Sequence, residues 1–180
     1  NVQYYKPKEN SPEIKYLNEC RIKLGGYLPE RSSFAKAIKT PPQDIFGKMK
    51  ESTGDKEMST TMVLVRMLTN LMRDKNVAPR LVPIIPDEAR TFGMEGFFQK
   101  IGIYAHEGQK YEPEDAAQLS SYREEKSGQV LEEGINEAGA MSSWIAAGTA
   151  YTNHDIEMIP IYIFYSMFGF QRIGDLAWAA

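Results

Sequence analysis

The sequence has few of the residues from which disulfides and protein-built metal sites are made. Its 180 residues include 1 cysteine, Cys20, and 2 histidines, His106 and His154. A lone cysteine excludes an internal disulfide framework and fits a reducing compartment. The two histidines lie far apart without ligand spacing around them, so neither a zinc site nor a self-contained Ser-His-Asp triad is expected. We therefore expect no metal ligands in this chain.

Several other signatures are missing. The sequence contains no Gly-x-Gly-x-x-Gly, no Walker-type Gly-Lys-Ser/Thr and no Cys-x-x-Cys. Its longest apolar run, Met158 to Tyr165, is about a third of the length that spans a membrane. The polar residues 1–10 lack the apolar core of a secretory signal. A formal net charge of -3 does not favour nucleic-acid binding. The sequence predicts a soluble, cytoplasmic protein with neither a membrane nor a nucleic acid as partner.

Proline and glycine divide the chain into two parts. They are frequent in residues 1–56, which we interpret as a linker with short helices near Pro12 to Lys23 and Pro42 to Glu51. Residues 57–180 have the size of one globular domain. The chain begins without Met and stops in the apolar run Leu176 to Ala180. We expect a piece of a longer protein, with the domain truncated at its C-terminus.

From Ser59 onward, apolar runs alternate with helical patterns. Ser59 is placed to cap a helix whose apolar residues recur at helical spacing. The last run is apolar enough to be buried on both faces of a parallel sheet. The alternation predicts an α/β fold with a mostly parallel sheet flanked by helices, in which ligands bind beyond the carboxyl ends of the strands. The expected strands are Arg80 to Ile85, Gly128 to Leu131 and Met158 to Phe164, and the expected later helices are Asn136 to Thr149 and one starting near Gly169 or Phe170.

Glu137 is the most unusual residue of the domain. It begins a helical stripe whose other members are apolar or glycine, namely Met141, Trp144, Ile145 and Gly148. A carboxyl group on such a stripe costs free energy to bury unless it has a partner, and burial changes its pKa. Two interpretations stay open: a buried, tuned carboxyl group, or a first-turn glutamate that only complements the helix dipole.

Two further segments follow expected strands. Asp87, Glu88 and Arg90 come after the first strand, where they would form either a substrate-facing ion cluster or an ordinary salt bridge. After the third strand come four aromatic residues in seven positions, including Tyr165 and Phe168. They would form either a flat apolar wall for a heteroaromatic ring or part of the core.

Three stretches at these strand ends carry a family resemblance. They are Leu81 to Gly96, Gly134 to Ala140 and Tyr165 to Asp175, with supporting matches at Leu24 to Pro29 and Ser59 to Thr61. Together they resemble the homodimeric bacterial pyruvate dehydrogenase decarboxylase component, over about Leu24 to Ala180. The resemblance implies the central, pyrimidine-binding, transketolase-like domain of a three-domain enzyme that depends on thiamine diphosphate.

The resemblance also implies cofactors and partners. Thiamine diphosphate would lie between this domain and the diphosphate-binding domain of a second subunit. The Mg²⁺ ligands, a Gly-Asp-Gly motif and a downstream Asn, would lie in a domain absent from this chain. The implied partners are pyruvate, the lipoyl domain of dihydrolipoyl acetyltransferase and a second copy of the parent subunit. The isolated chain would be inactive.

By position, the resemblance assigns roles to six residues. Glu137 would hydrogen-bond a ring nitrogen of the aminopyrimidine, and Phe168 would stack on that ring. Tyr165 would face the substrate. The remaining three would lie in or near the active centre: Glu88, Asp87 and Asp115.

Two alternatives remain. The first is a related thiamine enzyme such as a transketolase, although a sugar phosphate calls for more cationic groups than the strand ends carry. The second is a non-catalytic module that keeps the same fold for dimerisation or docking. In that module the small-residue helix after Asn136 and the aromatic segment would serve only as contact surfaces.

Overall fold

The computed structural model describes residues 4–26, 34–86, 89–114 and 122–180. A short parallel sheet lies at the centre of the body, with the strand order β4-β1-β5. Its strands are β1 (Leu81–Ile85), β4 (Leu131–Glu132) and β5 (Ile159–Tyr162). β4 joins β1 only from Ile84 onward, so Pro83, which has no N–H, takes no part in that ladder. The parallel pairing confirms the expected fold class.

A second, two-stranded parallel sheet is attached to the edge of the first. It consists of β2 (Ile103–Tyr104) and β3 (Glu124–Glu125), and a bridge from Ile103 to Val130 connects it to the chain entering β4. Gly128 makes this close approach possible, because a Cβ atom there would overlap the Ile103 backbone. The sequence did not predict these strands.

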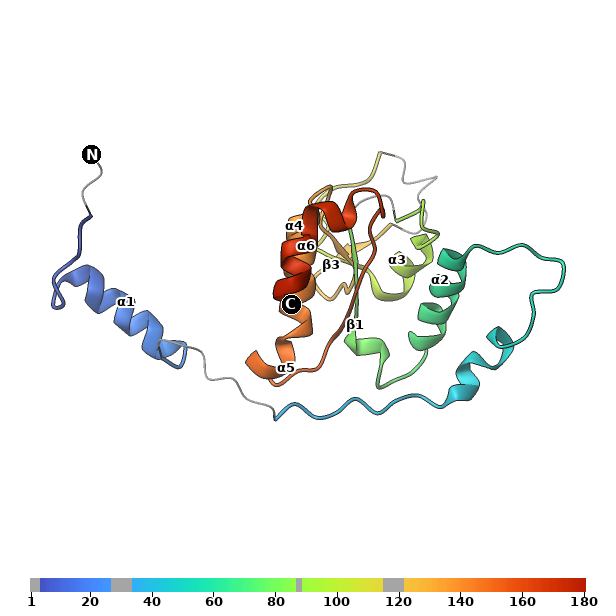
Figure 1. The fold of residues 1–180 in the computed structure, drawn as a ribbon, viewed down its shortest axis with the longest axis horizontal. Helices are drawn as coiled ribbons and strands as arrows, with labels where there is room; N and C mark the ends of the chain where they lie inside the picture. Colours follow the sequence, from blue (N-terminus) through green and yellow to red (C-terminus); the bar gives the residue numbers. More distant parts are fainter. Residues whose placement is uncertain (1–3, 27–33, 87–88, 115–121) are drawn as a thin grey trace.

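Helices cover both faces of the central sheet (Figure 1). On one face α4 (Glu137–Gly148) contacts β1 and β5, and α6 (Gly169–Ala179) packs on α4. On the other face lie α2 (Thr60–Leu71) and α3 (Glu95–Ile101). The short α5 (Ala150–Asn153) follows α4, and the 3-10 turn η2 (Ala78–Arg80) leads into β1. The order is helix layer, sheet, helix layer.

The main core fills the space between the sheet and the α2–α3 layer. Burial of each large apolar side chain contributes about 1.5–3 kcal/mol before entropy is counted. α2 begins where the sequence predicts, because the Ser59 side chain accepts a hydrogen bond from the Met62 N–H at 3.2 Å. The buried residues of this cluster are Val65, Leu68, Ile85, Ala89, Met94, Phe97, Phe98, Ile103 and Val130.

The prediction that the last strand is buried on both faces was wrong. β5 lies at the edge of the described sheet, and all four of its residues are half-buried. The strand enclosed by neighbours is β1, in which four of five residues are buried. Edge position depends on tertiary pairing, which the composition of one strand does not reveal.

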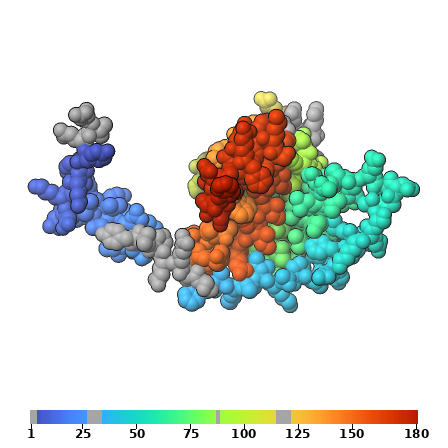
Figure 2. Space-filling model, in the orientation of Figure 1, coloured from blue at the N-terminus to red at the C-terminus, as the bar shows by residue number. Residues whose placement is uncertain are grey.

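In the N-terminal part, which the sequence predicts to be a linker, residues 34–49 follow the lower edge of the body (Figures 1 and 2). This part contains α1 (Pro12–Lys23), in which no residue is buried, and the 3-10 helix η1 (Gln43–Met49). Hydrogen bonds fasten it to the body: the Ile38 N–H donates to Glu157 Oε2 at 2.7 Å, and Asn70 Nδ2 donates to the Ile45 carbonyl at 3.1 Å. Both helices lie where the sequence predicts them.

Two tyrosines hydrogen-bond to one carboxylate at the start of β3. The hydroxyls of Tyr111 and Tyr122 both donate to Glu124 Oε1, at 2.5 and 2.6 Å. The Tyr122 ring also packs edge-on against Phe98. Burial, followed by the Glu124 hydrogen bond, raises the pKa of Tyr122 well above its ordinary value.

Among the described helices, none is both long and apolar enough to cross a membrane.

Candidate functional site

A pocket of about 320 Å³ opens at the carboxyl ends of the central strands. It is where ligands bind in open parallel sheets. One wall comes from Pro86 after β1, a second from the start of α4, and a third from the segment that joins β5 to α6. The lining residues are Pro86, Ile135, Glu137, Phe164, Tyr165, Phe168 and Arg172.

Glu137 is held in the pocket by the way α4 begins. The Asn136 side chain accepts a hydrogen bond from the Gly139 N–H at 3.1 Å and caps the helix. This cap makes Glu137 the first helical residue, at the edge of the sheet. Its side chain is only 12% exposed and lines the pocket. Glu137 thus lies in the first turn of α4 and, mostly shielded from water, in the wall of the pocket.

Arg172 is the ionic partner of Glu137. Its Nη1 lies 2.6 Å from Glu137 Oε1, and its guanidinium carbon lies 4.7 Å from the centre of the Phe168 ring. The arginine therefore pairs with the carboxylate and covers an aromatic face at once. It is 47% exposed, so one side of the pair remains open to water.

The aromatic segment forms a wall and is not part of the core. Tyr165 and Phe168 are 39% and 40% exposed, and the Tyr165 ring lies 5.2 Å from that of Phe92, tilted by 44°. Gly169 begins α6 directly against the Phe164 ring, which a Cβ atom at that position would overlap. The turn into α6 thus depends on glycine, and it directs the aromatic side chains around the pocket.

One buried hydroxyl lies close enough to Glu137 to be influenced by its charge. The Tyr162 hydroxyl oxygen is buried and has no hydrogen-bond partner within the described part of the chain. Burial raises the pKa of Tyr162, and the negative charge of Glu137 raises it further. An unsatisfied buried hydroxyl costs roughly 1–3 kcal/mol.

The structure brings together three of the six residues singled out from the sequence. Glu137, Tyr165 and Phe168 line one pocket. The other three lie outside the described residues: Asp87, Glu88 and Asp115. Sequence reasoning gave no role to Arg172. The available signal was its spacing, one helical turn after Phe168. In the described ranges, no group of three His, Cys, Asp or Glu residues could hold a metal ion.

Comparison with known proteins gives a consistent result. Residues 41–180 match the family described as the pyruvate dehydrogenase E1 component middle domain. The pyruvate dehydrogenase E1 component of Pseudomonas aeruginosa is 60% identical over 179 residues, which are 99% of this chain and 20% of that protein. The E1 components of Mycobacterium tuberculosis and Escherichia coli (strain K12) are each 53% identical, over 98% and 96% of this chain.

The chain spans about a fifth of the length of these relatives. The family match covers the linker from residue 41 and the whole of the central sheet with both helix layers. It also agrees with the resemblance carried by the strand-end segments. The chain belongs to the family of the pyruvate dehydrogenase E1 component middle domain.

Proposed function

We propose that this chain supplies the aminopyrimidine half of a thiamine diphosphate site. The observation that carries the proposal is the position of Glu137, a nearly buried carboxyl group among aromatic walls at the carboxyl ends of parallel strands. A flat heteroaromatic ring needs an apolar face to stack on and a polar group aimed at its edge nitrogens. Phe168 and Glu137 provide these two elements in one pocket.

The residues present fit the cofactor in composition. Among the described lining residues most are apolar, and Glu137 carries the carboxyl group to which a ring nitrogen would hydrogen-bond. The unpaired Tyr162 hydroxyl adds a polar atom near the same carboxyl group. When bound, thiamine diphosphate supplies a carbon nucleophile and an electron sink for decarboxylation. This chain would hold the ring and share a proton with its nitrogen through Glu137.

Binding of the aminopyrimidine ring would require Arg172 to move away from Phe168. Arg172 now covers the Phe168 face and occupies one oxygen of Glu137. A ring stacked on Phe168 would need that face, so we infer that Arg172 swings aside. Tyr165, on the same wall, would face the substrate. Because Arg172 is about half exposed, its guanidinium group loses little free energy when water replaces the Glu137 carboxylate as its partner.

We further propose that the intact protein is a pyruvate dehydrogenase E1 component. It would decarboxylate pyruvate and transfer the acetyl group to the lipoyl domain of dihydrolipoyl acetyltransferase, as a cytoplasmic homodimer. The Mg²⁺ ligands would lie outside this chain. Within the chain, residues 1–56 would act as the linker and 57–180 as the pyrimidine-binding domain. Asp87, Glu88 and Asp115 would approach the substrate side of the site.

The decisive experiment replaces Glu137 by Gln in the full-length protein. The amide keeps the size of the side chain but cannot share a proton as a carboxyl group does. Acetyl transfer from pyruvate should fall on the order of 10²–10⁴-fold, as for loss of a general acid–base group. The control is Glu95→Gln, which alters an exposed carboxylate on α3 outside the pocket and should leave the rate unchanged.

Two outcomes would change the proposal. Full activity in Glu137→Gln would favour a non-catalytic dimerisation or docking module built on the same fold. Turnover of a ketose phosphate, with no reaction of pyruvate, would favour a transketolase-like enzyme. Arg172 is the only cation that lines the described pocket, which supports a small 2-oxo acid over a sugar phosphate.

A further inference from the structure

A second cavity lies between the linker and α2, on the opposite helix layer from Glu137. It has a volume of about 470 Å³, within the range of small-molecule sites, and shares no lining residue with the Glu137 pocket. One wall is the end of the linker and the two residues after it, from Lys48 to Met58, and the other is α2 with the turn after it, from Val63 to Arg73. We call it the linker groove.

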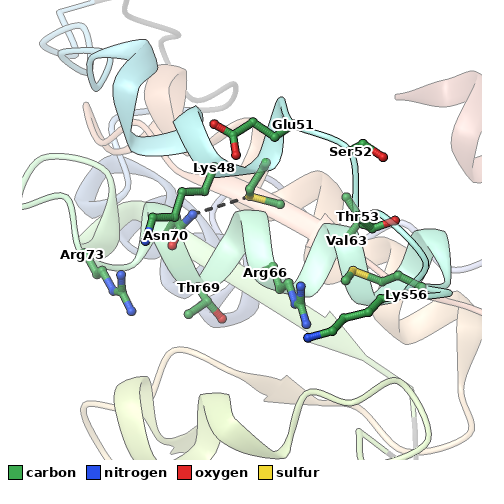
Figure 3. Close-up of a pocket in the computed structure, with 12 residues that line it drawn as sticks. Lys48, Glu51, Ser52, Thr53, Lys56, Val63, Arg66, Thr69, Asn70 and Arg73 are labelled. Atoms are coloured by element: carbon green, nitrogen blue, oxygen red, sulfur yellow. Dashed lines mark hydrogen bonds between the residues drawn. The ribbon is translucent and has the colours of Figure 1, made fainter.

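The linker groove is strongly cationic in a chain whose net charge is negative. Lys48, Lys56, Arg66 and Arg73 line it, against the single carboxylate of Glu51. Figure 3 shows Lys48 and Arg73 toward one end of the groove and Lys56 and Arg66 toward the other. Within the described ranges, none of these cations forms an ion pair. Their charge is thus available to an anion from outside.

The rest of the lining suits an anion attached to an apolar body. Ser52, Thr53 and Thr69 offer hydroxyl donors, and the half-buried Met58 and Val63 offer apolar contact. The shape of the groove is fixed at one end, because the Asn70 amide donates to the Ile45 carbonyl at 3.1 Å and contacts Met49 Sδ at 3.5 Å (Figure 3). The linker therefore cannot drift from α2 at this point without breaking these contacts.

We propose that the linker groove binds a small molecule carrying two or more phosphate groups. Cations at both ends of an elongated groove match an extended polyanion better than a single point charge. Arginine guanidinium groups bind phosphate oxygens through paired N–H donors, and lysines add point charges. The apolar residues would contact the organic part of the ligand. This site is independent of the proposed thiamine site, since it uses other residues on the other side of the sheet.

Calorimetric titration with ADP, AMP and inorganic pyrophosphate tests the proposal in the full-length protein and in this chain. ADP should bind more tightly than AMP, because the second phosphate reaches the second pair of cations. Reversing one pair, by Arg66→Glu with Lys56→Glu, should weaken ADP binding roughly tenfold or more, as expected for lost charge-assisted hydrogen bonds. The matched control is Lys100→Glu with Lys126→Glu, two exposed lysines outside the groove that change the net charge equally.

Each outcome is informative. Equal loss of ADP binding in the control pair would mean diffuse attraction and would overturn the proposal. Equal affinity for ADP and AMP would remove the argument for two phosphates. Pyrophosphate as tight as ADP would assign recognition to the phosphates alone, whereas weaker binding would support an apolar contact. Binding by the 180-residue chain but not by the full-length protein would mean that the groove is filled by another part of that protein, and the site would be withdrawn. The Glu137→Gln variant should bind ADP normally, so failure here leaves the thiamine proposal intact.

Discussion

The Glu137 pocket and the linker groove differ in how their charged side chains are paired. In the Glu137 pocket, one carboxylate and one arginine neutralise each other among aromatic walls. In the linker groove, four cations share one carboxylate, and none of them is paired inside the described ranges. The first arrangement is typical of a site that holds a largely neutral ring, and the second of a site that attracts an anion from solution. Pairing, more than the number of charged residues, separates the two.

Replacing Phe168 by Ala should have the largest effect on the first cavity. The substitution removes the exposed aromatic face on which the aminopyrimidine would stack. Affinity of the full-length protein for thiamine diphosphate should fall roughly tenfold or more, since stacking on an aromatic side chain contributes about 1–3 kcal/mol per base in comparable ring contacts. Met167→Ala, at an adjacent residue that is 77% exposed and does not line the pocket, is the control. Equal losses in both variants would remove Phe168 from the site.

The turn into α6 can be tested with two glycines of the same helix. Gly169→Ala should lower the free energy of unfolding by about 1–3 kcal/mol, because the new methyl group overlaps the Phe164 ring. Gly174→Ala meets no atom within 4 Å and should stabilise by up to about 1 kcal/mol through helix propensity. Urea unfolding of both variants measures the difference. Similar values would show that Phe164 moves aside without cost.

The tyrosine pair near β3 predicts a loss of stability in alkali. The pKa of Tyr122 is raised in the folded protein above an ordinary value of 10.0, so the folded state holds its proton more firmly than the unfolded state does. This contribution is fully present below about pH 10 and is lost as the pH rises further. The free energy of unfolding of the Tyr122→Phe variant, measured with urea, should therefore fall less steeply than that of the unmodified protein between about pH 9 and 11. An unchanged slope would assign the alkaline loss to other groups.

The smallest effect is expected from the Glu137–Arg172 pair itself. Because Arg172 is about half exposed, a double-mutant cycle with Arg172→Met and Glu137→Gln should give a coupling of about 0.2–1 kcal/mol. A coupling several times larger would mean that the pair is a rigid part of the fold. That result would count against the movement of Arg172 that the proposed function requires.

Much of the fold follows from local signals in the sequence. The Ser59 cap, the apolar runs of β1 and β5 and the Asn136 start of α4 all lie where pattern and capping chemistry place them. α3 was missed, since it has seven residues and its N-cap, Met94, makes no side-chain cap. β2 and β3 have two residues each and exist only through pairing with distant segments.

The candidate site was predictable only in part, for a related reason. Helical and strand periodicity put Glu137 and the aromatic segment at one edge of a sheet. The partner of Glu137 depends on how α6 packs against α4, which no single segment encodes. The linker groove likewise arises from the contact of η1 with α2, between residues that are unremarkable as a sequence.

The hydrogen bond from the Ile38 N–H to Glu157 holds the linker at one end of the central sheet. Glu157 stands two residues before β5 begins, so the linker crosses below the starting edge of the sheet (Figure 1). The Glu137 pocket opens at the opposite, carboxyl ends of the strands, and the described linker contributes no residue to its lining. A ligand that enters the Glu137 pocket from that side therefore displaces no linker residue of the described part of the chain.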